Sequence, residues 1–244
     1  MKVQFELPRA ILQAHKLTSK DVNRENLSHL YITKKETVVT NGHHLTRIKH
    51  AIEPFAQSEK KSFVDWVAGT DHTNPISGAP SQVESRDDWN EATKDFWNGA
   101  GIMVPSNAIK PLLVGAKTYS RWFLELLTPR KAILSRTDAD RVHSTIPVEL
   151  SDLSFPDYNQ VIPEYSKTAE DLGAVGMDLA YIADFWAYLK ASKVCSGGSF
   201  TAYPSIRDDL SPIRIDLDSA GLASEGSGLS YDATITWVLM PIRI

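Results

Sequence analysis

The strongest constraint on the fold is a local plan that the chain repeats three times: a short apolar strand, a helix, and then several alternating strands. The repeat predicts a modular α+β protein whose sheets share their edges. The opening strands are expected at residues 3–5, 101–104 and 174–177, and the helices at 8–14, 105–116 and 178–189. Further strands are expected at 30–32, 37–40, 132–134, 144–148, 213–217 and 233–240.

The repeat also predicts how the chain divides into domains. Residues 1–164 contain two units, separated by an inserted polar loop at about 68–98 with one short helix expected around 87–96. Residues 165–244 contain one further unit. Pro111 is expected to kink the second helix or to shift its start, because proline removes a helical hydrogen bond.

Composition narrows the class of protein. Apolar residues make up 42% and charged residues 23%, which is ordinary for a globular chain. No apolar run approaches 18 residues and the N-terminus does not read as a signal peptide, so a cytoplasmic, cofactor-free protein is expected. Cys195 is the one cysteine, which excludes an internal disulfide and argues against a cysteine-based metal site.

The distribution of charge is more informative than the net charge of −4. The helical regions 7–20 and 96–124 contain Lys and Arg but no Asp or Glu, whereas Asp178 and Asp184 offset the lysines of the third helix. Basic helices lining one surface would face phosphates without reading bases, so their binding would be salt-sensitive and independent of sequence. The alternative is that they are solvated helix faces. The candidates are Arg9, Lys16, Lys20, Lys110, Lys117, Arg121, Lys190 and Lys193.

Three motifs then occur in the order of a known family. Residues 37–45 contain Thr-Asn-Gly-His-His-Leu, residues 155–163 read Phe-Pro-Asp-Tyr-Asn-Gln-Val-Ile-Pro, and residues 238–244 read Val-Leu-Met-Pro-Ile-Arg-Ile. They resemble Thr-Asp-Gly-His-Arg-Leu, Phe-Pro-Asp-Tyr-Arg-Arg-Val-Leu-Pro and the terminal Val-Met-Pro-Met-Arg-Leu of the bacterial DNA polymerase III beta subunit, the sliding clamp. The resemblance implies a DNA-clamp fold of β-α-β-meander units, with helices lining a lumen and sheets outside.

The resemblance also implies a hydrophobic pocket for linear peptides of polymerases, the clamp loader and repair proteins. Its aliphatic side chains would form an apolar trough, and Met240 could repack around different ligands. Asn41, His44, Asn159 and Gln160 depart from the family motifs and make the rim less cationic. The pocket residues carried over are Leu27, Thr40, Gly42, His43, His44, Leu45, Pro156, Gln160, Val161, Val238, Met240, Pro241, Ile242 and Arg243.

The count of units implies how a ring would be assembled. Clamps of the family carry six units per chain and form rings of twelve from two chains, whereas this chain has three. Four chains would restore twelve units, and a miscounted unit would instead give a trimer. A shortened clamp of this type suits a phage or prophage genome. Loading onto duplex DNA would need a separate ATP-driven machine, because no nucleotide-binding motif occurs here.

Two other functions compete with this interpretation. An enzyme is suggested by the grouping of His29, His43, His44 and His50, but the adjacent pair would point to opposite faces of a strand, and no zinc or hydrolase motif accompanies them. We therefore expect no enzymatic activity and no metal. The other alternative is a clamp-like adaptor or decoy that binds the same peptides without encircling DNA.

Overall fold

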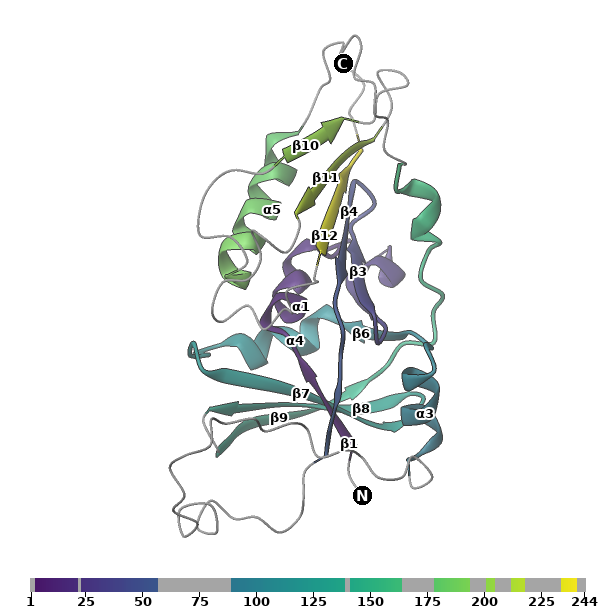
Figure 1. Cartoon of the computed structure of the whole chain (residues 1–244), viewed down its shortest axis with the longest axis vertical. Coiled ribbons are helices and arrows are strands. Elements are labelled where there is room, and N and C mark those ends of the chain that lie inside the picture. Colours follow the sequence, from purple (N-terminus) through teal and green to yellow (C-terminus); the bar gives the residue numbers. More distant parts are fainter. Residues whose placement is uncertain are drawn as a thin grey trace, which may run out of the picture.

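The computed structural model describes residues 3–21, 23–56, 89–138, 141–163, 178–193, 201–204, 212–217 and 234–240. Its strands form two antiparallel sheets (Figure 1). Sheet A has the order β5 (Pro54–Ala56), β1 (Val3–Leu7), β7 (Ser120–Thr128), β8 (Lys131–Asp138), β9 (Arg141–Glu149). Sheet B has the order β10 (Thr201–Pro204), β11 (Ile213–Leu217), β12 (Thr234–Leu239), β4 (His44–Lys49), β3 (Glu36–Thr40), β2 (His29–Ile32), β6 (Ile102–Pro105).

The described helices are short, apart from the last one. None of them is long and apolar enough to cross a membrane. Their bounds are α1 (Arg9–Gln13), the 3-10 turns η1 (Ala14–Leu17) and η2 (Glu25–Ser28), α3 (Glu91–Trp97), α4 (Ser106–Leu113), η3 (Tyr158–Val161) and α5 (Leu179–Ser192).

The first two units exchange their opening strands. Strand β1 precedes α1 but pairs with β7 of the second unit, where Phe5 lies opposite Leu124. Strand β6 precedes α4 but pairs with β2 of the first unit, where Tyr31 lies opposite Met103. Each sheet of residues 3–163 therefore contains strands of both units, and neither unit has a complete sheet by itself.

The third unit extends sheet B. Strand β12 pairs antiparallel with β4 along its whole length, and β11 and β10 follow outward. In Figure 1, α5 lies on one side of these strands and the segment containing η3 lies on the other. Sheet B therefore has two covered faces, which we call the helix face and the outer face.

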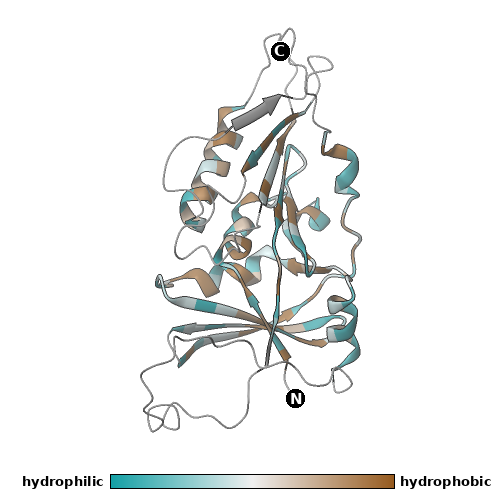
Figure 2. Ribbon diagram, in the orientation of Figure 1, coloured by the Kyte–Doolittle hydropathy of each residue, from teal (hydrophilic) through white to brown (hydrophobic). Residues whose placement is uncertain are grey.

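Alternation along the strands decides which side chains enter the main core. Ile48, Ile235 and Trp237 point to the helix face and are buried, and the ring of Trp237 stacks on Phe185 of α5 at 4.6 Å between centroids. The apolar residues in Figure 2 gather where the helices meet the sheets. The predicted stripe on α5 is only partly correct, because Phe185 and Leu189 are buried while Ile182 and Trp186 are half-buried and Tyr188 joins the core.

Two local expectations need correction. The second helix begins at Ser106, directly after Pro105, and Pro111 lies inside it without shifting its start. The end of the inserted segment is not a polar loop, because Trp89 and Phe96 are buried against Phe5. The expected short helix is present as α3, where the Asn90 side chain accepts a hydrogen bond from the Thr93 amide at 2.9 Å. The rest of the insertion, residues 68–88, lies outside the described residues.

Candidate functional site

The outer face of sheet B carries a second, smaller apolar cluster. Val38, Leu45 and Val238 are buried there, on three adjacent strands, and Leu45 lies opposite Val238 in the β4–β12 pair. The side chains that cover them are Tyr31, Phe155, Tyr158, Val161 and Ile162. The segment at 155–163 therefore packs on the strands that carry the first and third motifs, so the structure brings the three motifs together.

Polar contacts hold this segment in place. The Tyr158 hydroxyl donates a hydrogen bond to the Glu36 carboxylate, and burial together with this bond raises the pKa of Tyr158. The Arg214 guanidinium donates from Nη1 to the Pro163 carbonyl at 2.9 Å. The ring of Phe155 stacks on Tyr31 at 5.2 Å. The segment is thus anchored to both the first and the third unit.

The predicted pocket residues fall into two groups. Leu45, Val161 and Val238 belong to the outer cluster, and the Met240 amide donates to the His43 carbonyl at 2.9 Å, beside the turn that precedes β4. Pro156 and Gln160 are exposed on the covering segment. Pro156 lines a hollow of about 580 Å³ together with Tyr31 and Met103. Pro241, Ile242 and Arg243 lie outside the described residues.

His43 and His44 do not lie with this group. Because Leu45 faces outward, alternation turns His44 to the helix face, where it is 2% exposed between the rings of Tyr181 and Trp237. The ring of His43, in the turn, stacks on the same Tyr181 at 5.3 Å. The structure thus places neither ring with the outer cluster, and because both rings contact Tyr181, the expectation that they point to opposite faces is wrong.

Burial also decides the protonation of His44. Burial, together with the smaller effect of the neighbouring His43, lowers the pKa of His44 to about 4. His44 is therefore neutral at pH 7 and behaves as a core residue.

Thr40, Gly42 and Leu27 shape the turn that joins β3 to β4. The Thr40 hydroxyl donates to the His44 carbonyl at 2.6 Å and accepts from the Gly42 amide at 3.1 Å. Gly42 has φ of 90°, and a Cβ there would lie 2.6 Å from Nη1 of Arg24. Leu27 is half-buried beside this glycine. These contacts fix the backbone of the turn that precedes Leu45 of the outer cluster.

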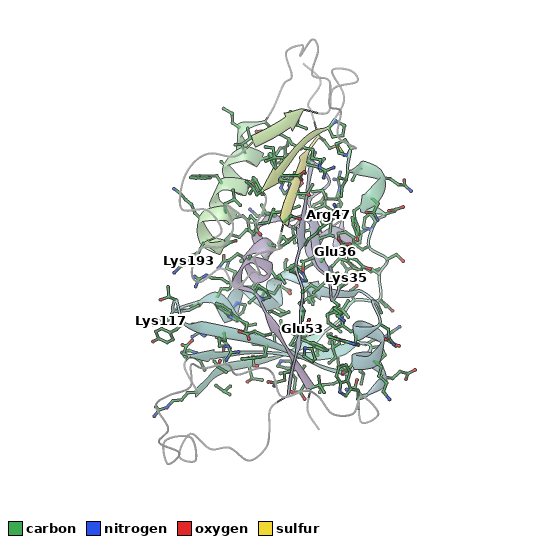
Figure 3. The ribbon with its side chains drawn as sticks, in the orientation of Figure 1. Lys35, Glu36, Arg47, Glu53, Lys117 and Lys193 are labelled. Atoms are coloured by element: carbon green, nitrogen blue, oxygen red, sulfur yellow. The ribbon has the colours of Figure 1, made fainter. Side chains whose placement is uncertain are left out.

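Four of the predicted basic residues lie on the helices that pack together on the other side of sheet B, namely Arg9, Lys16, Lys110 and Lys190. Lys20 and Lys117 lie in the loops that follow η1 and α4. Lys16, Lys20, Lys110 and Lys117 are exposed. Burial lowers the pKa of His15, and the positive charges of Lys16 and Lys110 lower it as well. Both lysines, which belong to different units, therefore lie near His15. Lys190 is exposed over the Trp186 ring, and Lys193 is half-buried at the C-terminal cap of α5. Figure 3 shows Lys117 and Lys193 on the same side of the molecule.

Two predicted basic residues have other roles. Arg9 donates to the carbonyls of Ala191 and Lys117, both at 3.2 Å, so it ties α1 to the ends of the other two helical regions. Arg121 belongs to β7 rather than to a helix and donates from Nε to the Glu6 carboxylate at 2.8 Å. It points away from the helices, because the next residue, Trp122, faces α4 and alternation separates the two.

The sequence did not predict two surface hollows that are each lined by several basic side chains. One, of about 300 Å³, is lined by Lys16, Lys20 and Arg24 together with two acidic residues, Asp21 and Asp184. The proximity of Arg24 to the predicted lysines in the sequence was the available signal.

The other hollow, of about 870 Å³, is lined by Lys34, Lys35, Lys49 and Trp97. The Lys34 ammonium lies 3.2 Å from the centroid of the Trp97 ring. These lysines come from a turn and from the end of β4, and no local pattern joins them to a tryptophan of α3.

The histidine grouping does not form a metal site in the part of the chain that the structure describes. His50 is buried on sheet B, where its Nε2 is 2.8 Å from the Thr37 hydroxyl, and His29 is also buried. Among the described residues, no group of three His, Cys, Asp or Glu lies close enough to hold a metal ion.

Comparison of the whole structure with solved structures identifies the fold. Neither a protein-family model nor a curated protein matches the sequence. The DNA polymerase III beta subunit of Thermotoga maritima matches 99% of the chain at 15% identity and a TM-score of 0.52. The beta subunit of Caulobacter crescentus matches 100% at 15% identity and 0.53, and the sliding clamp of Pseudomonas aeruginosa matches 99% at 14% and 0.52. The chain has the fold of a bacterial sliding clamp.

The predicted α+β clamp fold is therefore confirmed. The chain spans about two thirds of the length of these clamps, covering 66% of the Thermotoga and Pseudomonas chains and 67% of the Caulobacter chain.

Proposed function

We propose that this protein is a sliding clamp: a ring of several copies that encircles duplex DNA and docks linear peptides of replication and repair proteins. The observation that carries this proposal is the placement of the two surfaces. The described parts of the three motif segments meet on the outer face of sheet B, while the exposed lysines lie on the helices across the same sheet and in the loops that follow these helices. Such an arrangement separates the partner-binding surface from the DNA-facing surface.

The docking site would work by apolar burial. Leu45 and Val238 are already packed beneath Val161 of the covering segment, and Met240 follows β12 at the adjacent turn. An aliphatic peptide side chain that enters beside them loses its contact with water, which contributes about 1.5–3 kcal/mol for each fully buried side chain. Arg243 would hold a peptide carbonyl or carboxylate. Polymerase, clamp loader and repair proteins would share this one site.

The DNA-facing surface would act without reading bases. Lys16, Lys20, Lys110 and Lys117 are long, exposed side chains that can follow phosphates at several positions. Contacts of this kind weaken as salt displaces them, so they permit sliding. Topological closure would then retain the protein on DNA. The function needs no bond chemistry, and a separate loader would supply ATP hydrolysis in the cytoplasm of a bacterium or of a phage-infected cell.

A clamp-like adaptor or decoy is the alternative, because the outer cluster would bind the same peptides without a ring. Retention on DNA separates the two functions. The protein is mixed with nicked circular DNA, a bacterial clamp loader and ATP, and bound protein is isolated by gel filtration. A clamp is retained on the circle and lost when the circle is linearised. No retention on the circle favours the adaptor, and retention that survives linearisation contradicts sliding.

Peptide binding tests the docking site separately. A fluorescent clamp-binding peptide of a bacterial replicative polymerase is titrated with the protein. Val161→Asp places a charge in the outer cluster and should weaken binding at least tenfold. Asn159→Asp, on the exposed side of the same turn, introduces the same charge and should leave binding nearly unchanged. Equal effects of the two changes would contradict the assigned site.

A further inference from the structure

The units of this chain are joined by two kinds of contact. In the first kind, two units exchange opening strands, as β1 and β6 do between the first and second units. In the second kind, the last strands of two units pair antiparallel, as β4 and β12 do between the first and third units. Both contacts join equivalent elements, so each relates its two units by an approximate two-fold rotation.

Each unit can make one contact of each kind, because it has one opening strand and one last strand. The first unit makes both within the chain. The second unit has exchanged its opening strand, but its last strand, β9, pairs only with β8 among the described strands. Val142 on β9 is 64% exposed. The second unit therefore lacks a last-strand contact.

The third unit is described less completely. Its first strand after the helix, β10, has the position that β2 has in the first unit. Strand β2 lies between β3 and the exchanged strand β6, whereas β10 pairs only with β11 among the described strands. The opening strand that the sequence predicts at 174–177 lies outside the described residues.

We propose that a second copy of this chain completes the second unit by a like-to-like contact. The β9 edges of two copies pair antiparallel with each other, as the equivalent last strands β4 and β12 do within the chain. The inference rests on the proposed ring and goes beyond it, because it specifies which ends meet. A head-to-tail ring would instead join β9 to β10, a pairing of unlike edges that occurs nowhere in the described sheets.

The like-to-like rule limits the number of copies. Each copy has one β9 edge, and each like-to-like contact uses the β9 edges of two copies. A ring in which every β9 edge is paired therefore contains an even number of copies. Three copies are excluded, whereas four copies give twelve units. The two-fold axes lie in the plane of such a ring, so two docking sites would open on each of its faces.

A single-cysteine experiment tests the rule. A like-to-like contact brings one residue close to itself in a second copy, whereas a head-to-tail contact does not. Thr145 is exposed in the middle of β9. Thr145→Cys, made in full-length protein that also carries Cys195→Ser, is treated with a short bis-maleimide at concentrations where the assembly is populated. Asn107→Cys, exposed on α4, is the matched control, and a monofunctional maleimide establishes that both thiols react equally.

The expected result is covalent dimers for Thr145→Cys and none for Asn107→Cys, with a native mass of four chains for both. Amides of β9 should also exchange with deuterium as slowly as those of β4 in the assembly, and more rapidly after dilution to single chains.

The contrary results are distinguishable. A mass of three chains, or crosslinks that form only in a mixture of Thr145→Cys with Ala202→Cys on β10, would overturn like-to-like pairing while leaving the ring intact. A mass of one chain at every concentration, with no crosslinks, would remove the ring as well.

Discussion

Arg136 and Leu112 are joined by a buried hydrogen bond that closes the end of α4. Nη1 of Arg136 donates to the Leu112 carbonyl at 3.0 Å and to the Val114 carbonyl at 2.7 Å, and the side chain is 1% exposed. Nη2 donates to the Asp138 carboxylate at 3.2 Å. The cation thereby satisfies carbonyls that a helix end leaves without partners, and its charge interacts favourably with that end of the helix.

Replacing Arg136 should therefore be costly. Arg136→Met keeps most of the side-chain volume but removes the charged donor from both carbonyls and from Asp138, so the free energy of unfolding should fall by about 3 kcal/mol, as is typical when one partner of a buried ion pair is removed. Arg130→Met, at an exposed ion pair with Asp152, is the control and should cost under about 1 kcal/mol. Urea denaturation measures both, and equal losses would contradict the capping role.

The stability of the protein should depend on pH through two buried histidines. Burial lowers the pKa of His44 and of His50 from 6.5 to about 4. A lowered histidine pKa means that the unfolded chain binds protons more readily, so stability is fully present above pH 6.5 and is lost as pH falls toward 4. The slope should approach about 1.4 kcal/mol per pH unit for each histidine.

Denaturation at pH 7, 6, 5 and 4.5 tests this dependence. His50→Gln should remove about half of the slope between pH 6.5 and 4.5. His143→Gln, at an exposed position of β9, should not change it. A wild-type slope that persists in His50→Gln would show that other groups dominate.

Reversing the charge of four lysines on and beside the helices should abolish retention on DNA. Glutamate at Lys16, Lys20, Lys110 and Lys117 turns four cations into four anions on the surface proposed to face phosphates. Retention on circular DNA should be lost, while peptide binding at the outer cluster should stay within about twofold of wild type. The matched control is glutamate at Lys34, Lys35, Lys49 and Lys131, which lie away from these helices. Retention unaffected by the first set would favour the adaptor.

The Tyr158 hydroxyl should contribute to both stability and docking. Tyr158→Phe leaves Glu36 without this donor, which should cost about 1 kcal/mol of unfolding free energy. The loosened segment should also bind the polymerase peptide a few-fold more weakly. Tyr119→Phe removes a hydroxyl from a side chain that is 61% exposed and should change neither quantity. Peptide affinity that stays constant in Tyr158→Phe would separate the anchor from the docking site.

Local patterns predicted most of the repeated elements, because a strand followed by an amphipathic helix is a short-range signal. They missed β7, where the apolar Phe123 shares a face with Arg121 and Glu125 and therefore interrupts the alternation of apolar and polar residues. They also missed β4, where His44 and Thr46 are buried polar residues that hide the period of two.

The site was predicted less completely than the fold. The resemblance of three motifs identified Leu45, Val161 and Val238, which the structure brings together. It also included His44, which faces the helices, because a motif does not say which of two adjacent strand residues faces outward. Sequence reasoning could not see that Arg9 binds the carbonyls of Lys117 and Ala191, because these positions are far from Arg9 in the sequence. Long-range partners of this kind leave no local trace.

The exchange of β1 and β6 has a consequence for how the chain folds as it is synthesised. Strand β1 is synthesised long before β7, its partner on one edge, which begins at Ser120, and β2 must likewise wait for β6 at Ile102–Pro105. Until then the nascent chain presents an apolar strand edge with no native neighbour, the state in which chaperones bind and wrong pairings form. Residues 3–163 should therefore reach their native state in one late, cooperative event, at a rate set by long-range strand pairing rather than by their helices.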